Sequence, residues 1–458
     1  MQIKSQTFKA MAATFMAAVL LFVSTSLTFA QSAPLPLIRD AEIEGLMRLY
    51  TRPIFKVAGI NPKSVKVYLI ADNRINAFVS NGQRIFVHTG LITQSATPNE
   101  VIGVLAHETG HIAGGHLARM GVELDRASIT AVIGMLAGVA AVAGGVAAGD
   151  SEAAKAGQGV MMGSQSLAQR NFFAYQRDME SSADQAALKY LSATHQSAKG
   201  MIQLFDKLSR QSIATIRYAD PYVMSHPMPM ERIRNLETAA KKAPGYDSVD
   251  PPELILRHHL AQAKLAGFME SAQIVMQRYP RSDMSLPARY ARAIALFRRG
   301  DITNALPIIE SLVEDLPQNP YFWELKGQAL LENGRASEAL APLQQAVTLL
   351  PNNGLIQLLL AQALIDTESK GNAEAALKLL HKAERSEGGM PAIFKYKARA
   401  YGLTGQLGKA ELATAEAALL QGDKELALQK AKLAQARFKA GTPEWTRAND
   451  ILNFASRD

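Results

Sequence analysis

Residues 101–111 read VIGVLAHETGH, and this stretch decides how the rest of the chain is interpreted. His107 and His111 are four residues apart, which on an α-helix places both imidazoles on one face, one turn apart. That spacing suits two nitrogen ligands of one tetrahedral zinc ion, with Glu108 directed at the water that the metal would hold. The apolar residues before His107 predict a buried helix, and a buried histidine pair without a ligand would cost free energy. The stretch therefore predicts a catalytic zinc centre.

A catalytic zinc site needs a third protein ligand and an open fourth position. Downstream, residues 178–184 read DMESSAD, so Glu180 and Asp184 lie one helical turn apart. We predict that Glu180 is the third ligand, and that Asp184 accepts the N–H of a zinc-bound histidine and so fixes its tautomer. Asp178 is an alternative ligand. A solvated acidic helix face is the other interpretation of this segment, and the histidine motif upstream disfavours it.

The composition limits the kind of protein that carries this site. The chain has 458 residues, of which 48% are hydrophobic and 20% charged, and this indicates two or three globular domains. Cysteine is absent, which excludes disulfides, thiolate zinc sites and a cysteine nucleophile, so any metal must be held by histidine and carboxylate. The formal net charge is +8, but no run of Lys and Arg is long enough to follow a phosphate backbone, and we expect no nucleic-acid partner.

The beginning of the chain predicts export. Lys4 and Lys9 form a basic region, residues 10–23 are apolar, and Thr28-Phe29-Ala30 offers small residues at a cleavage site. We interpret residues 1–30 as a signal peptide cleaved near Ala30, and the protein as periplasmic. An anchor helix is the alternative, but the apolar run is short for one.

Hydrophobic patterning predicts the elements around the zinc motif. We expect an α+β zincin-like metalloprotease domain over 31–250, mainly helical with a small β-sheet. The strands at 74–80 and 84–88 flank Asn81-Gly82, which is a strong hairpin signal. The other expected elements are a strand at 64–71 and helices at 37–57 (closing near Pro53), 97–119 and 177–193.

The C-terminal part carries a sequence repeat from about Pro287 onward. Pro317 and Pro351 stand 34 residues apart, which is the period of tetratricopeptide repeats. Small residues recur where paired helices must approach closely, at Ala305, Ala339, Ala376 and Ala410. We expect an all-α tetratricopeptide-repeat solenoid over 251–458, capped by helices at about 253–280 and 424–457. A generic stack of helical hairpins is the alternative.

Residues 127–149 carry no charge and are rich in Gly, Ala and Val. The segment is long enough to cross a bilayer, yet it lies between two ligand segments that must meet on one side. We therefore expect residues 127–165 to form a mobile apolar loop that covers the active site or makes peripheral contact with a membrane. If residues 127–149 insert fully, the protein is an integral-membrane protease.

His-Glu-x-x-His followed by Glu-x-x-x-Asp resembles the gluzincin metallopeptidases of the HtpX and CAAX-prenyl-protease type. Further matching segments are Asn76-Ala77-Phe78, Gly90-Leu91 and His226-Pro227 with Arg232. The resemblance implies that His107, His111 and Glu180, rather than Asp178, hold one zinc ion, and that Glu108 is the general base.

The same resemblance implies roles for other residues. The strand with Asn76, Ala77 and Phe78 would bind an extended substrate by β-addition. His226 would either steady the oxyanion or occupy the open zinc position as a switch, and Arg232 would either anchor substrate or pair near Glu180. His116 and His88 are expected to be structural.

A signal peptide before such a domain and repeats after it resemble periplasmic proteases of outer-membrane β-barrel assembly. The predicted function is a zinc endopeptidase for unfolded or misassembled envelope proteins, associated with the outer membrane, whose repeats bind the β-barrel assembly machinery. The alternative is a repeat scaffold or chaperone with a structural zinc site. Glu108 favours the enzyme, because a structural site has no use for an acid at the general-base position.

Overall fold

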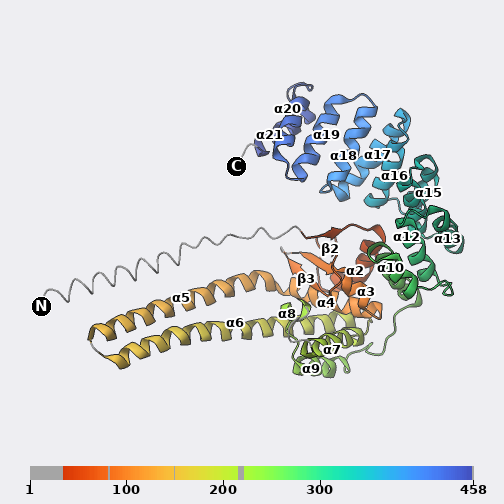
Figure 1. The fold of residues 1–458 in the computed structure, drawn as a ribbon. Helices are drawn as coiled ribbons and strands as arrows, with labels where there is room; N and C mark the ends of the chain where they lie inside the picture. Colours follow the sequence, from red (N-terminus) through yellow and green to blue (C-terminus); the bar gives the residue numbers. More distant parts are fainter. Residues whose placement is uncertain (1–34, 81–82, 149, 215–220, 456–458) are drawn as a thin grey trace. The chain divides into compact units, whose positions relative to one another are not determined.

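The structure is a computed structural model that describes residues 35–80, 83–148, 150–214 and 221–455 (Figure 1). The predicted signal peptide and the Asn81-Gly82 turn lie outside the described residues. The part of the chain from Leu37 onward forms one compact unit.

A small mixed sheet has the strand order β1-β2-β4-β3. β2 (Lys66–Ile70) is parallel to β4 (Arg84–His88), whereas β1 (Leu37–Ile38) and β3 (Ala77–Ser80) are antiparallel to their neighbours. The predicted antiparallel pairing of the strands on either side of residues 81–82 is confirmed, although β3 is shorter than the expected 74–80. β3 lies at an edge of this sheet, beside the helix that carries the zinc motif.

Helix α2 (Ala41–Val57) begins four residues later than the helix expected over 37–57 and ends at the same residue. Its first residues instead form β1, and the helix begins after Asp40, whose side chain accepts a hydrogen bond from the backbone N–H of Ile43. The helix also continues past Pro53, which removes one backbone hydrogen bond. Ile54 and Phe55 are almost completely buried in the core, and their burial offsets that loss.

Helix α4 (Pro98–Gly114) lies at the centre of the protease domain. Gly103 allows close packing against Met201 of α7 (Lys199–Ala214), because a Cβ at this position would lie 2.3 Å from the Cβ of Met201. The helix ends earlier than the predicted residue 119. Gly115 adopts the left-handed conformation with φ of 62°, which ends α4 and redirects the chain at His116.

The loop expected over 127–165 is a wrong prediction of secondary structure. α5 (His116–Ala148) and α6 (Ser151–Ala193) cover this region as two helices that lie side by side in antiparallel directions (Figure 1). Alanine, the best helix former, is abundant here and offsets the cost of the glycines. Among the described helices, the segment His116–Gly144 of α5 is long and apolar enough to cross a membrane, although such a property of one helix is weak evidence by itself.

The protease domain is completed by α3 (Thr89–Gln94), α7, α8 (Pro221–Ser225) and α9 (Met230–Ala240). The rest of the described chain is helical, as predicted, and the motif alanines Ala305, Ala339 and Ala376 are fully buried between paired helices. The helices of this region are α10 (Pro252–Met269), α11 (Ala272–Arg278), α12 (Leu286–Arg298), α13 (Ile302–Asp315), α14 (Pro320–Glu332), α15 (Ala336–Leu349), α16 (Gly354–Asp366), α17 (Lys370–Glu387), α18 (Pro391–Leu403), α19 (Leu407–Leu420), α20 (Lys424–Gln435) and α21 (Pro443–Ala455).

Candidate metal centre and active site

The two histidines of the motif project from the same face of α4. Nε2 of His107 lies 3.0 Å from Nε2 of His111, and His107 is fully buried. Glu108 is buried beside them, with Oε1 3.4 Å from Nε2 of His226. The chain that follows α8 brings His226 to this point from more than a hundred residues away.

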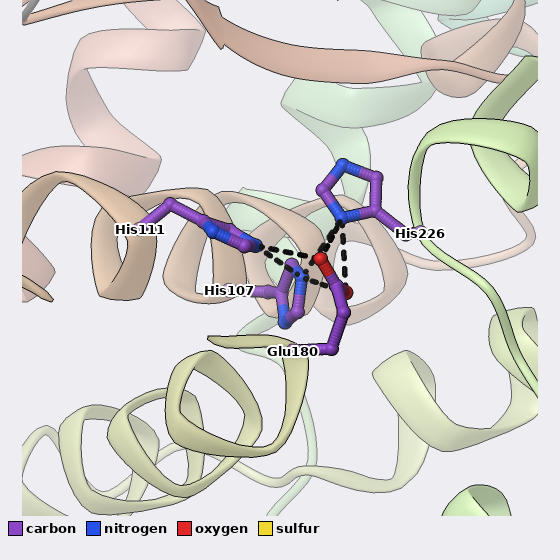
Figure 2. A group of neighbouring side chains, drawn as sticks. All are labelled: His107, His111, Glu180 and His226. Atoms are coloured by element: carbon purple, nitrogen blue, oxygen red, sulfur yellow. Dashed lines mark hydrogen bonds and ion pairs between the residues drawn. The ribbon is translucent and has the colours of Figure 1, made fainter. Parts of the chain in front are cut away.

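Glu180 on α6 completes the group (Figure 2). Its Oε2 lies 3.3 Å from Nε2 of His107, and its Oε1 lies 3.4 Å from Nε2 of His111. Nδ1 of His226 lies 3.0 Å from Oε1 of Glu180 and 3.4 Å from Nε2 of His107. The four donor atoms all lie within 4.8 Å of one another.

These donors fit a zinc ion in number, chemistry and spacing. Three imidazole nitrogens and one carboxylate oxygen are ligands that zinc accepts. Ligand atoms about 2.0–2.1 Å from a tetrahedral zinc would be about 3.4 Å apart. The separations among His107, His111, Glu180 and His226 are 3.0–3.4 Å where they are closest. Asp178, the alternative ligand, is exposed and is not among the four residues that converge.

Asp184 and Arg232 support the opposite side of His107. Oδ1 of Asp184 lies 3.0 Å from Nδ1 of His107, so that the other ring nitrogen faces Glu180. Arg232 donates to both carboxylate oxygens of Asp184, at 2.7 and 2.8 Å, and its Nη1 lies 3.0 Å from Oε2 of Glu180. Arg232 therefore pairs with the carboxylates of both α6 residues.

Comparison with known proteins agrees with this geometry. Residues 39–240 match peptidase family M48, a family of zinc metallopeptidases. This part of the chain is therefore an M48 peptidase domain. Residues 290–354 match a tetratricopeptide repeat family.

Curated relatives are similar to this chain over more than half of its length. The chain is 28% identical over 274 residues to a putative beta-barrel assembly-enhancing protease of Vibrio cholerae, covering 56% of this chain and 52% of the relative. It is 24% identical over 307 residues to the beta-barrel assembly-enhancing protease of Yersinia pestis, covering 64% of this chain and 59% of the relative. The corresponding Escherichia coli protein is 23% identical over 265 residues, covering 56% and 52%. The chain thus spans between half and three fifths of the length of these relatives.

Two solved structures are also similar to part of the chain. "MamA MSR-1 C2" is 18% identical with a TM-score of 0.31, covering 38% of this chain and 98% of that one. A thermophilic tetratricopeptide protein from Thermus thermophilus is 20% identical with a TM-score of 0.28, covering 37% and 100%. These likenesses are too low to carry an argument.

His116 has a place in the M48 site that the sequence did not reveal. Its Nδ1 lies 3.0 Å from Nδ1 of His111, on the side of that ring opposite Glu180. Spacing on a continuous helix would turn His116 away from the ligand face, but α4 ends at Gly115 and the chain turns. The Gly114-Gly115 pair was the only signal in the sequence that could have indicated this contact.

The surroundings of the M48 site shift the pKa values of its groups in different directions. Burial raises the pKa of Glu108 above its ordinary value, although the nearby histidines oppose this shift. Burial and the positive charge of His107 lower the pKa of His111 to about 2. Burial would also lower the pKa of His107, but Asp184 and Glu180 outweigh burial and raise it to about 9. A carboxyl group with a raised pKa is suited to exchange protons near neutral pH.

The candidate substrate strand lies next to Glu108: the backbone N–H of Val79 on β3 is among the groups that lower the pKa of this carboxyl group. Ala77 is fully buried, and the ring of Phe78 stacks on Phe86 with centroids 5.2 Å apart. Asn76 is also buried, and among the described residues its Oδ1 has no hydrogen-bond partner. The side chains of Ala77 and Phe78 therefore pack within the fold, and β3 is an edge strand of the sheet.

A cavity of about 620 Å³ borders Glu180 and Asp184 of α6. Its wall includes Phe173 and Arg177 of α6, Pro227 and Met228 of the segment after His226, and Arg232 of α9. The cavity has room for side chains of a bound peptide, and its walls are mainly apolar.

Proposed function

We propose that this chain is a zinc-dependent endopeptidase in which His107, His111 and Glu180 hold one zinc ion and Glu108 is the general base. The observation that carries the proposal is the convergence of the ligand atoms, within 4.8 Å, next to a buried carboxylate that is not itself a ligand. A structural metal would not require Glu108 at this place.

Each residue then has a defined part in peptide hydrolysis. Zinc, when bound, supplies a Lewis acid that polarises the scissile carbonyl and lowers the pKa of water. Glu108 takes a proton from the attacking water and delivers it to the leaving amine, and its raised pKa suits both transfers. Asp184 and Arg232 are positioning residues, because they fix the ring of His107 and the carboxylate of Glu180.

His226 is proposed to hold the enzyme latent. Its Nδ1 faces the centre of the group, where a substrate or water would need the fourth position. It follows Ser225 at the end of the short helix α8, so a local movement of this segment could withdraw it. The other role, stabilising the oxyanion, would require Nε2, which instead faces Glu108 at 3.4 Å.

The substrates are proposed to be unfolded or misassembled envelope proteins. The backbone edge of β3 can pair with any extended chain, which favours broad sequence tolerance. The relatives' names point to β-barrel assembly, and the residues at 1–30 have the pattern of a signal peptide. We infer a periplasmic location with outer-membrane association, and recruitment of the β-barrel assembly machinery by the repeats.

A scaffold or chaperone with a structural zinc is the second candidate. The observation that favours it is the fourth donor: with His226 in place, the set is closed, as structural zinc sites are.

One experiment separates the two candidates. Zinc content and cleavage of casein and of an unfolded outer-membrane protein are measured for the wild type, Glu108→Gln and His226→Ala. The peptidase proposal expects Glu108→Gln to keep zinc and lose cleavage, and His226→Ala to keep zinc and cleave faster. A wild type and a His226→Ala variant that bind zinc but never cleave would support the scaffold.

A further inference from the structure

The outer side of α5 exposes several large apolar side chains. Ile129, Val132, Ile133 and Leu136 each expose more than half of their surface, at 58%, 54%, 62% and 64%. Isolated exposed apolar residues are normal on a protein, but a contiguous patch of this kind marks a binding surface. The stretch of α5 from residue 127 to residue 148 contains no charged residue.

The opposite side of α5 is already occupied by α6. A Cβ on Gly134 would lie 2.3 Å from Oγ of Ser164, and one on Gly138 would lie 2.1 Å from Cγ of Met161. The two glycines, four residues apart, therefore let the helices approach closely. At 100° per residue, Leu136 lies about 160° around the helix from both glycines, and Ile133 lies about 100–140° from them.

The outer side of α6 has a different character. Over residues 155–170, the exposed residues on this side are largely polar. They include Lys155, Gln158, Gln165, Ser166, Gln169 and Arg170. The exposed apolar exceptions on this part of α6 are Val160, Met162 and Leu167. The helical hairpin formed by α5 and α6 is therefore two-sided: the outer side of α5 exposes mainly apolar residues, and the outer side of α6 exposes mainly polar ones.

We propose that the hairpin lies along a lipid membrane, with the outer face of α5 in the interfacial layer and α6 on the aqueous side. The uncharged stretch is about 33 Å long at 1.5 Å per residue. Charged residues stand at both of its ends, with Arg126 at one and Asp150 at the other. Helices bound at a membrane interface have such an apolar face and a polar back.

The charges near the ends of α5 and α6 indicate whether anionic lipid headgroups contribute to binding. Exposed Arg126, Lys155 and Arg170 are accompanied by Asp150 and Glu152, so the two signs nearly balance. Arg126 is also paired with Glu123 at 2.6 Å. Burial of apolar surface, rather than attraction to anionic headgroups, should therefore supply most of the binding free energy.

Two other occupants fit less well. A helix crossing the bilayer would carry α6 with it and would place Gln158, Gln165 and Gln169 in hydrocarbon without partners. A second copy of the chain would cover one stripe along α5. The exposed side chains of Val132, Ile133 and Met135 instead point in three different directions around the outer half of the helix. A lipid surface accommodates all of them.

The proposal does not depend on peptidase activity, but it has a consequence for it. α5 begins directly after the zinc-motif helix, and α6 carries Glu180. The hairpin would therefore hold the M48 site close to a membrane surface, where envelope substrates are inserted.

The absence of cysteine makes a site-specific test possible. Single cysteines are introduced as Ile133→Cys, Leu136→Cys and, as the matched control, Gln165→Cys, and each is labelled with an environment-sensitive fluorophore. Vesicles of phosphatidylethanolamine and phosphatidylglycerol are then added. We expect a blue shift and a several-fold rise in emission at 133 and 136, with little change at 165 and weak dependence on salt.

Two kinds of fluorescence result would contradict the membrane arrangement. No change at any position, or an equal change at all three, would overturn the interfacial arrangement. A change at 133 and 136 that follows protein concentration without vesicles would show that a second copy covers the face instead.

A second measurement guards against a labelling artefact. The double variant Ile133→Glu with Leu136→Glu should lose vesicle flotation about tenfold or more, whereas Gln165→Glu with Ser166→Glu should float like the wild type. Both pairs are surface changes, so thermal unfolding and cleavage of soluble casein should stay unchanged. Equal flotation of the two double variants would contradict the proposal.

Discussion

Nδ1 of His116 lies 3.0 Å from Nδ1 of His111, on the side of the ring that faces away from Glu180. One of the two nitrogens must carry the proton between them. The contact orients the ring of His111, and when Nδ1 of His111 is the donor its Nε2 is free to bind a metal. Asp184 does the same for His107. Each of the two predicted metal-binding histidines therefore contacts a second residue through its Nδ1, the ring nitrogen that does not face Glu180.

The first prediction concerns this support. His116→Ala should weaken zinc binding by roughly 10–100-fold, because partners that orient metal ligands typically contribute that much. Competition with a chelator measures the affinity directly. His116→Asn, which keeps a polar group, should recover part of the loss. Unchanged zinc affinity in His116→Ala would show that the contact is only structural.

The second prediction concerns Asp184. Burial would raise the pKa of Asp184, but hydrogen bonds from Arg232 and from His107 lower it, so the carboxylate is charged. Asp184→Asn removes this charge at nearly constant shape and takes from the buried guanidinium of Arg232 its two-oxygen contact, leaving Glu180 as its charged partner. Zinc affinity should fall by roughly 10–100-fold, and the free energy of unfolding by about 3–5 kcal/mol.

Chelator competition and chemical denaturation check the two effects of Asp184→Asn separately. Arg232→Lys is the matched control, since it keeps the positive charge and loses the bidentate contact with Asp184. Its zinc affinity and free energy of unfolding should lie between those of the wild type and Asp184→Asn. Wild-type stability and zinc affinity in Asp184→Asn would contradict this account of the pair.

The third prediction concerns a buried charge cluster between α2, α10 and α14. Nζ of Lys264 lies 2.8 Å from Asp40, 3.4 Å from Glu42 and 3.6 Å from Glu324. One ammonium faces three carboxyl groups. Burial raises the pKa of Glu324 to about 7; Lys264 opposes this shift, and repulsion by the other two carboxylates reinforces it.

The sign of the pH dependence follows from that raised pKa. The folded state binds the proton of Glu324 more tightly than the unfolded chain, so its contribution to stability is full below the ordinary pKa and is lost as the pH rises through about 7. Glu324→Gln should therefore be more stable than the wild type above pH 7, on the order of 1 kcal/mol. Denaturant midpoints at pH 5 and pH 8 measure it.

Lys264→Met is the contrasting variant for this cluster. It leaves the carboxylates without their cation and should cost about 3–5 kcal/mol of unfolding free energy at neutral pH. If Glu324→Gln lost stability at pH 8 as Lys264→Met is expected to, Glu324 would be a needed partner of the lysine rather than a surplus acid.

The zinc motif could be predicted from the sequence because its information is local. Two histidines four residues apart on a helix must share a face, and the spacing of Glu180 and Asp184 carries the same information. The antiparallel hairpin of β3 and β4 was also predictable, because alternating residues flank a strong turn signal.

The rest of the site depends on tertiary structure. The turn at Gly115 brings His116 to His111, and no periodicity shows this. The position of α9 beside α6 places Arg232 against Asp184 and Glu180. The pairing of α5 with α6 is not visible in the sequence, because glycines that weaken an isolated helix here allow close packing against a second one.

The central claim is that Glu108 acts on a metal site built from His107, His111 and Glu180. The most direct test measures zinc stoichiometry and casein cleavage together in Glu108→Gln, with His226→Ala as a second background. The account predicts one zinc per chain and no cleavage with Glu108→Gln in either background. Zinc-dependent cleavage by Glu108→Gln at the wild-type rate would contradict it.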